Sequence, residues 1–136
     1  MGLDMLKKIL SFTFLTAVLC AFTLPDGLKG KWEYAGGLYN GKLQSASTEY
    51  TLQRKYNDAQ YEASFIEKGE KPIIYEQGKY ELNQDTCLET QTFSAQPTKL
   101  LNVTLRYRYQ IKNDTLTLNG VLPNGTVVQE YWKKVK

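Results

Sequence analysis

VTLRYRYQIK, residues 103–112, carries the clearest structural signal in this chain. Apolar and polar side chains alternate along it, which is the period of two expected for a half-buried β-strand. The apolar face of that strand would carry Val103, Leu105, Tyr107, Tyr109 and Ile111. A two-residue turn, Asn113-Asp114, follows, and TLTLN at residues 115–119 repeats the alternation. The stretch therefore predicts an antiparallel β-hairpin.

The same period of two extends from Gly30 to the last residues. The other predicted strands are Lys31–Tyr39, Thr48–Tyr56, Gln60–Ile66, Ile73–Leu82, Thr86–Phe93 and Thr126–Val135. Turn-forming pairs such as Asn40-Gly41 separate them, and at Gly78 we expect a bend or bulge. About eight strands joined by short turns predict an all-β protein, an antiparallel up-and-down β-barrel. Closing the sheet in this way would remove its exposed edges.

The first twenty residues have a different character. Lys7 and Lys8 precede an apolar run, residues 9–22, and this order is typical of a secretory signal peptide. Cleavage near Cys20 or Ala21 would leave a tether, residues 21–29, and one domain, residues 30–136. Residues 17–20, AVLC, also allow the alternative that Cys20 is lipidated. We therefore expect an exported protein, periplasmic or associated with the cell envelope, which would contact the membrane only if Cys20 is lipidated.

The composition argues against several kinds of chemistry. The sequence has no His, so the commonest general base and metal ligand is missing. Cys87 would be the one cysteine left after cleavage, without a base to activate it. The net charge of +3 is small for a nucleic-acid binder, and strand alternation separates the basic and aromatic residues of 105–109. We expect no enzyme activity, no metal, no cofactor and no nucleic acid, although chemistry by a lone Tyr, Lys or Glu stays open.

The start of the first strand and the second half of the chain resemble a known family. Gly30-Lys31-Trp32 resembles the Gly-x-Trp opening of lipocalins and other calycins. The second half is similar to exported bacterial lipocalin-like domains of unassigned function, through Gly78-Lys79-Tyr80, Asp85, Glu89, Phe93, Tyr107-Arg108-Tyr109-Gln110-Ile111, Asp114, Leu116, Gly120, Gly125 and Glu130-Tyr131-Trp132-Lys133-Lys134. The resemblance implies an eight-stranded barrel of a kind that mostly binds small apolar molecules. It also implies that Trp32 closes one end, with Lys133 or Lys134 stacked on its ring.

The barrel interior is the predicted ligand site. An eight-stranded barrel is either filled by its own side chains or holds one small ligand. The candidate lining residues are large aromatic residues expected to point inward, Tyr50, Tyr61, Tyr80, Tyr107 and Tyr109, together with Glu89, for which the sequence leaves open whether it faces inward. For Glu130, also on a strand, we expect solvent exposure.

Two hypotheses of function follow. The first is a non-enzymatic binding module that holds a small hydrophobic or amphipathic molecule inside the barrel. The alternative is a solid barrel that acts through its outer surface, as an interaction or structural protein of the envelope. The sequence pattern is the same for a lined cavity and a filled one, and it leaves the oligomeric state open.

Overall fold

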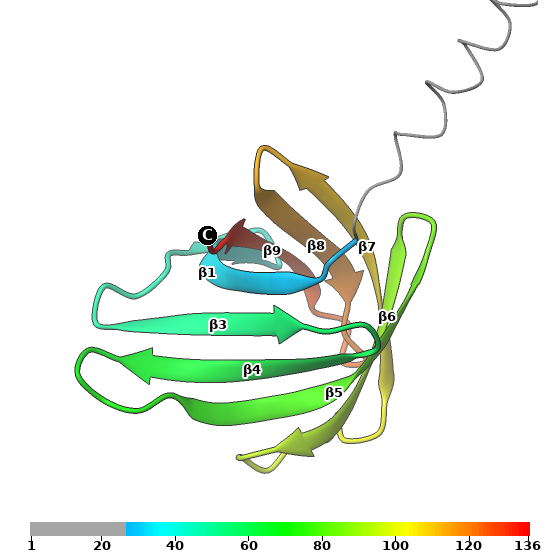
Figure 1. Ribbon diagram of the computed structural model, residues 1–136. Helices are drawn as coiled ribbons and strands as arrows, with labels where there is room; N and C mark the ends of the chain where they lie inside the picture. Colours follow the sequence, from blue (N-terminus) through cyan, green and yellow to red (C-terminus); the bar gives the residue numbers. More distant parts are fainter. Residues whose placement is uncertain (1–26) are drawn as a thin grey trace, which may run out of the picture.

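A computed structural model describes residues 27–136; the predicted signal peptide, Cys20 and most of the predicted tether lie outside these residues. Its strands are β1 (Gly30–Tyr39), β2 (Lys42–Gln44), β3 (Tyr50–Tyr56), β4 (Gln60–Glu67), β5 (Ile73–Asn83), β6 (Thr86–Ser94), β7 (Thr104–Lys112), β8 (Thr115–Val121) and β9 (Val127–Lys134). They form one antiparallel sheet in the order β2-β1-β3-β4-β5-β6-β7-β8-β9, and β1 also pairs with β9 (Figure 1). This pairing closes the sheet, so the predicted all-β antiparallel barrel is confirmed.

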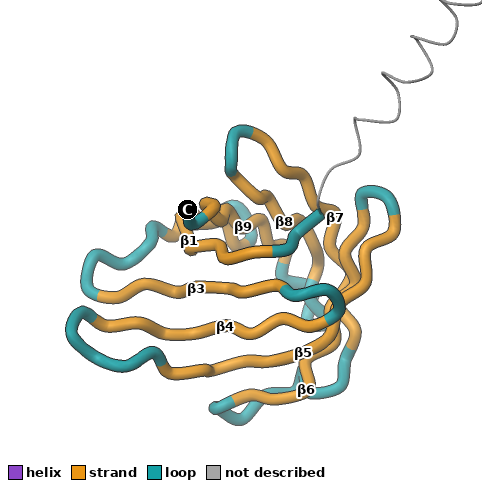
Figure 2. The backbone as a smooth tube through the Cα atoms, viewed as in Figure 1, coloured by secondary structure: helices purple, strands orange, loops and turns teal. Residues whose placement is uncertain are grey.

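The described part of the chain consists of strands and loops alone (Figure 2). No helix within residues 27–136 has the length and apolarity to cross a membrane. Both two-residue turns quoted from the sequence form hairpins. Asn40-Gly41 and Asn113-Asp114 have positive φ at both positions, between 51° and 79°, as a tight turn between twisted strands requires.

The short strand β2 is a difference from the sequence prediction. The second half of β1 pairs with β2, where Leu38 faces Leu43, while the first half pairs with β3, where Trp32 faces Arg54. The strands β2 and β3 thus share one edge of β1, separated by residues 45–49. Three residues are too few to show a period of two, which is why β2 was not predicted.

Two glycines allow aromatic rings to fold across the inside of the barrel. The register shifts at Gln77/Gly78, so the predicted irregularity at Gly78 is confirmed. Gly78 lies opposite Tyr61, and Gly120 lies opposite Tyr107. A Cβ atom would stand 2.6 Å from the Tyr61 ring at the first position and 2.7 Å from the Tyr107 ring at the second. Only glycine leaves room for these rings in their present positions.

One end of the barrel is filled with side chains. Trp32, 2% exposed, donates its indole N–H to the Leu28 carbonyl at 2.8 Å. The ammonium of Lys134 lies 4.7 Å from the centre of the Trp32 ring, and it donates to the Lys29 carbonyl. The buried residues that complete this end are Tyr56, Tyr80, Cys87, Leu116 and Leu118. The structure thus places Trp32 in the filled end of the barrel, with Lys134 beside its ring.

Candidate functional site

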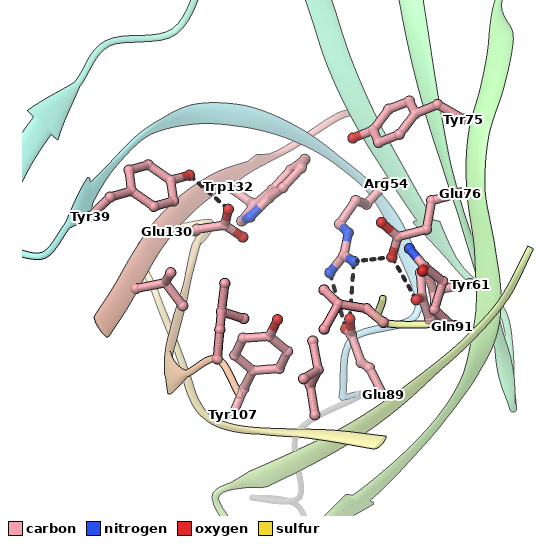
Figure 3. Close-up of a pocket in the computed structure, with 14 residues that line it drawn as sticks. Tyr39, Arg54, Tyr61, Tyr75, Glu76, Glu89, Gln91, Tyr107, Glu130 and Trp132 are labelled. Carbon is pink, nitrogen blue, oxygen red and sulfur yellow. Dashed lines mark hydrogen bonds and ion pairs between the residues drawn. The ribbon is translucent and has the colours of Figure 1, made fainter. Parts of the chain in front are cut away.

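The other end of the barrel is hollow. A cavity of about 270 Å³ lies between β1, β3–β7, β9 and the loops at that end (Figure 3). An apolar cavity of roughly 150 Å³ is enough to bind benzene, and typical ligand pockets start near 300 Å³. The cavity is thus large enough for one small organic molecule of roughly ten non-hydrogen atoms, scaled from benzene.

Aromatic and aliphatic side chains form much of the cavity wall. The rings come from Tyr39, Tyr61, Tyr75, Tyr107 and Trp132, and the aliphatic contacts from Leu100, Leu105, Leu122 and Val128. The strand residues point into the cavity because side chains of a strand alternate between the two faces of the sheet. Leu100 and Leu122 come from loops that border the mouth of the cavity. A wall of this composition favours ligands with an apolar part.

A buried ion pair lies at the inner end of the cavity. Arg54 is 7% and Glu89 2% exposed. The guanidinium donates to both carboxylate oxygens of Glu89, at 3.0 Å each. Burial alone lowers the pKa of Arg54, but neighbouring groups, Glu89 foremost, raise it well above its usual value. Arg54 therefore stays charged, and Glu89 compensates the charge within the barrel.

Tyrosine hydroxyls complete the hydrogen bonds of this pair. Tyr56 accepts from Arg54 at 2.8 Å and donates to Glu89 at 2.7 Å. A second carboxylate, Glu76, accepts from Tyr61 at 2.6 Å and from Arg54 at 3.3 Å. Burial, with a further contribution from Glu76, raises the pKa of Tyr61. Its hydroxyl therefore remains a hydrogen-bond donor at neutral pH.

Glu130 forms a second polar region, on the opposite wall of the cavity (Figure 3). Its Oε2 accepts from the hydroxyl of Tyr39 at 2.8 Å, and that hydroxyl is 2.9 Å from the hydroxyl of Tyr34. Among residues 27–136, no Lys or Arg nitrogen lies within 4 Å of Glu130, in contrast to Glu76 and Glu89. The expected solvent exposure of Glu130 is wrong, because its strand places it half-buried on the cavity wall.

Two residues that line the cavity each have a buried polar atom without a partner in the described part of the chain. The indole Nε1 of Trp132 and the side-chain Oε1 of Gln91 are buried and form no hydrogen bond among residues 27–136. Trp132 is only 3% exposed. A buried polar atom without a hydrogen-bond partner destabilises a folded protein by about 1–3 kcal/mol. A ligand group that bonds to one of these atoms would therefore gain binding free energy.

The cavity continues into a wider apolar groove at the mouth. This outer groove, of about 720 Å³, shares Tyr75, Glu76, Gln91 and Leu100 with the cavity. Its further apolar contacts come from Tyr50, Leu52, Phe65, Ile73 and Pro97. The site therefore has a polar inner part and an apolar outer part.

The structure divides the residues predicted to line the interior into three groups. Tyr61, Tyr107 and Glu89 lie on the cavity wall, and Tyr50 lies in the outer groove, 38% exposed. Tyr80 and Tyr109 do not line the cavity. Tyr80 packs edge-on against Tyr56 with its hydroxyl on the Asn57 carbonyl, and Tyr109 pairs with Leu118 of the core.

Sequence reasoning missed several residues of the site. Among these are Arg54, Glu76, Trp132, Glu130 and Tyr39. Arg54 had a usable signal, because it is a charge at an inward position of an otherwise apolar strand face. Glu76 had none, because the register shift of β4 against β5 between Ala63 and Ser64 lies beside it.

Comparisons with known proteins agree on the fold. No family model and no curated protein matches the chain. Among solved structures, it is similar to a lipocalin-like protein from Bacteroides uniformis, with a TM-score of 0.56, 14% identity and coverage of 79% of this chain and 98% of that one. It is also similar to a redesigned β-barrel, with a TM-score of 0.51, 14% identity and coverage of 80% and 92%. The fold of the chain is therefore that of a lipocalin-like β-barrel, closed by eight antiparallel strands with β2 as an addition.

Proposed function

We propose that this protein is a non-enzymatic binding module that holds one small amphipathic molecule at the open end of its barrel. The observation that carries the proposal is that two residues of the cavity wall, Trp132 and Gln91, each have a buried polar atom, Nε1 and Oε1, without a partner among residues 27–136. Most buried polar atoms in folded proteins have a hydrogen-bond partner, so two unpartnered atoms at one cavity support a partner supplied by a ligand. Export to the periplasm or the cell envelope, expected from residues 7–22, is part of the same proposal.

The two-part shape of the site supports an amphipathic ligand. Polar groups are gathered in the inner cavity, whereas Tyr50, Phe65 and Ile73 give the outer groove apolar walls. A ligand with its polar group inside would satisfy buried atoms, and its apolar part would cover the walls of the groove.

The state of the reactive side chains favours binding over catalysis. Arg54 and Glu89 are bonded to each other, so neither is free to move a proton. Burial raises the pKa of the Cys87 thiol, and Glu89 raises it further, which makes the thiol a poor nucleophile. Among residues 27–136, no cluster of three or more His, Cys, Asp or Glu is placed to hold a metal ion.

A second candidate function uses the outer surface. Val121 and Val127 are 62% and 53% exposed and lie beside Leu38 in a shallow groove over β1, β7, β8 and β9. Exposed apolar residues of this kind can contact a partner protein. A barrel that acts only through this face would need no cavity.

The test is native mass spectrometry of the protein purified from its own cells. We expect a reproducible extra mass that disappears when the protein is denatured. A Leu105→Trp variant, which fills the cavity, should lack the extra mass, whereas Leu43→Trp, at a leucine 75% exposed on β2, should retain it. The bare mass of the polypeptide, together with no binding of an apolar fluorescent probe, would overturn the proposal.

A further inference from the structure

We propose that the ligand is a small amine, with Glu130 as the counter-ion of its ammonium group and Trp132 Nε1 as donor to an acceptor atom close to that amine. This inference rests on the proposed function and specifies the chemical class of the ligand. It is carried by the charges of the cavity wall, by the position of Glu130 and by the unpartnered indole N–H.

The charges of the cavity wall favour a cation. One guanidinium, Arg54, and three carboxylates, Glu76, Glu89 and Glu130, line the cavity, so the formal sum is 1 − 3 = −2. An opposite charge within about 4–6 Å stabilises a charged group, and a like charge destabilises it. A ligand ammonium would therefore be favoured there, and a ligand carboxylate would be repelled.

Arg54 is not available to bind an anionic ligand. Its two terminal nitrogens already donate to Glu89, Glu76 and the Tyr56 hydroxyl. A ligand carboxylate would have to displace one of these acceptors, which would leave a protein carboxylate buried without its partner. Arg54 therefore bonds to other groups of the protein, and its terminal nitrogens have no donor left for an anionic ligand.

Glu130 is the carboxylate that lacks a cation. Its Oε2 accepts the Tyr39 hydroxyl, and among residues 27–136 no hydrogen bond to its Oε1 is found. A carboxylate can accept about four hydrogen bonds, so this group has capacity for an ammonium donor. In Figure 3 the carboxylate of Glu130 lies at the cavity, away from Arg54 and its partners.

Aromatic rings around the same space suit a cation. Tyr39, Tyr107 and Trp132 all line the cavity with Glu130. A cation within about 6 Å of such a ring face is stabilised, most strongly where water is excluded. The protein already uses this interaction internally, since the guanidinium carbon of Arg54 lies 4.8 Å from the ring centre of Tyr61.

The unpartnered N–H of Trp132 adds a second requirement. Trp132 and Glu130 are two residues apart on β9, so their side chains leave the same face of the strand, about 7 Å apart along the backbone. An indole N–H can only donate. The ligand should therefore carry an ether, hydroxyl or carbonyl oxygen a few bonds from its amine.

Four probes of nearly the same size separate these requirements. The probes are 2-phenoxyethylamine, 2-phenoxyethanol, phenoxyacetate and 3-phenylpropylamine; the first has both the amine and the ether oxygen. Isothermal titration calorimetry of the full-length protein measures their affinities. We expect 2-phenoxyethylamine to bind about tenfold or more tightly than 2-phenoxyethanol, as a charge-assisted hydrogen bond predicts, and phenoxyacetate to bind most weakly.

Variants then assign the two contacts. Glu130→Gln should weaken 2-phenoxyethylamine by about tenfold and leave 2-phenoxyethanol nearly unchanged. The matched control Glu81→Gln, at an exposed carboxylate on β5, should change neither affinity. In the unmodified protein, 2-phenoxyethylamine should bind more tightly than 3-phenylpropylamine, which lacks the ether oxygen, and Trp132→Phe should remove this difference. Should a variant fail to fold by circular dichroism, the order of the four probes on the unmodified protein decides.

The possible failures are distinguishable. Equal binding of the amine and the alcohol, or tightest binding of phenoxyacetate, would overturn the amine inference and leave the proposed binding function in place. No binding of any probe to the folded protein, with no extra mass in the native spectrum, would overturn the binding function itself.

Discussion

Arg54 and Glu89 are each buried, and each depends on the other for its charge compensation. Removing one member of a buried ion pair leaves the other charged in a medium that solvates it poorly. We therefore expect Glu89→Ala to lower the free energy of unfolding by about 3–5 kcal/mol. Denaturation in urea, followed by circular dichroism, measures this change.

An exposed ion pair provides the control for that variant. Asp85 accepts from Arg108 at 3.2 Å, and their side chains are 60% and 78% exposed. Because water already solvates both charges, Asp85→Ala should cost less than about 1 kcal/mol. Similar losses of unfolding free energy for the two variants would contradict the burial of the Arg54–Glu89 ion pair.

Cys87 should be unreactive in the native protein. It is fully buried, with its Sγ 3.8 Å from a Glu89 oxygen, and burial together with Glu89 raises the pKa of the thiol. Iodoacetamide at about pH 8 should leave Cys87 unmodified in the folded protein, since the thiolate is the nucleophile. Peptide mapping measures the modification, and the same treatment in denaturant should modify Cys87 fully. Rapid labelling of the folded chain would show that this end of the barrel opens.

The ion pair also shows what a single strand cannot reveal. The sequence places Arg54 on the apolar face of its strand, but its partner Glu89 lies 35 residues further on. Alternation predicts which way each side chain points, and not which two inward residues meet across a closed barrel. Glu89 could be selected as an inward candidate, whereas the contact between the two required the closed structure.

A glycine on β8 allows a tyrosine ring of β7 to pack closely against the strand. Gly120 faces Tyr107, whose ring occupies the place of a side chain on β8. Gly120→Val should therefore lower the free energy of unfolding by about 1–3 kcal/mol, the range for overpacked sites. It should also weaken ligand binding, because a displaced Tyr107 ring would enter the cavity.

Asn119→Val provides the control on the same strand. Asn119 is a half-buried neighbour of Gly120 and, by alternation, belongs to the opposite face of β8. Its replacement should change stability by less than about 0.5 kcal/mol and leave ligand binding unchanged. Thermal unfolding and titration calorimetry measure stability and ligand affinity. Equal changes for both variants would contradict the importance of the contact between Gly120 and the Tyr107 ring.

Strand patterns predicted the architecture better than the site. The period of two, with turns such as Asn113-Asp114, was sufficient for an antiparallel barrel. It did not give the depth of a residue along the barrel axis, and depth separates Tyr107 in the cavity from Tyr109 near the filled end. Depth depends on the stagger of all strands in a closed sheet, which no single strand contains.

Buried tyrosines make the folded chain sensitive to alkali. Burial raises the pKa of Tyr75 to about 12, although Arg54 partly opposes this, and the pKa of Tyr61 and Tyr107 is raised as well. Between the usual tyrosine pKa near 10 and about 12, the unfolded chain loses protons that the folded chain keeps. The contribution of these tyrosines to the free energy of unfolding should therefore be complete below pH ~10. It should decrease as the pH rises through this range.

Ultraviolet absorbance of tyrosinate, measured with circular dichroism, tests this expectation. The absorbance of the buried tyrosines should rise together with the loss of β-sheet signal, because ionisation accompanies unfolding. Tyr75→Phe should make the fall in stability with pH less steep, since one linked proton is removed. Full ionisation of all tyrosines near pH ~10 with the β-sheet signal intact would contradict the burial of these rings.

The seam between β1 and β9 has a consequence for the order of folding. Every other pairing joins strands that are near in sequence, and such hairpins form within about 1–10 μs. The seam instead joins residues such as Tyr39 and Glu130, which are 91 positions apart, and distant pairings slow folding. One edge of β1 therefore stays unpaired until β9 joins it. Because β9 also carries Val128, Glu130 and Trp132, the strand that closes the barrel also completes the wall of its cavity.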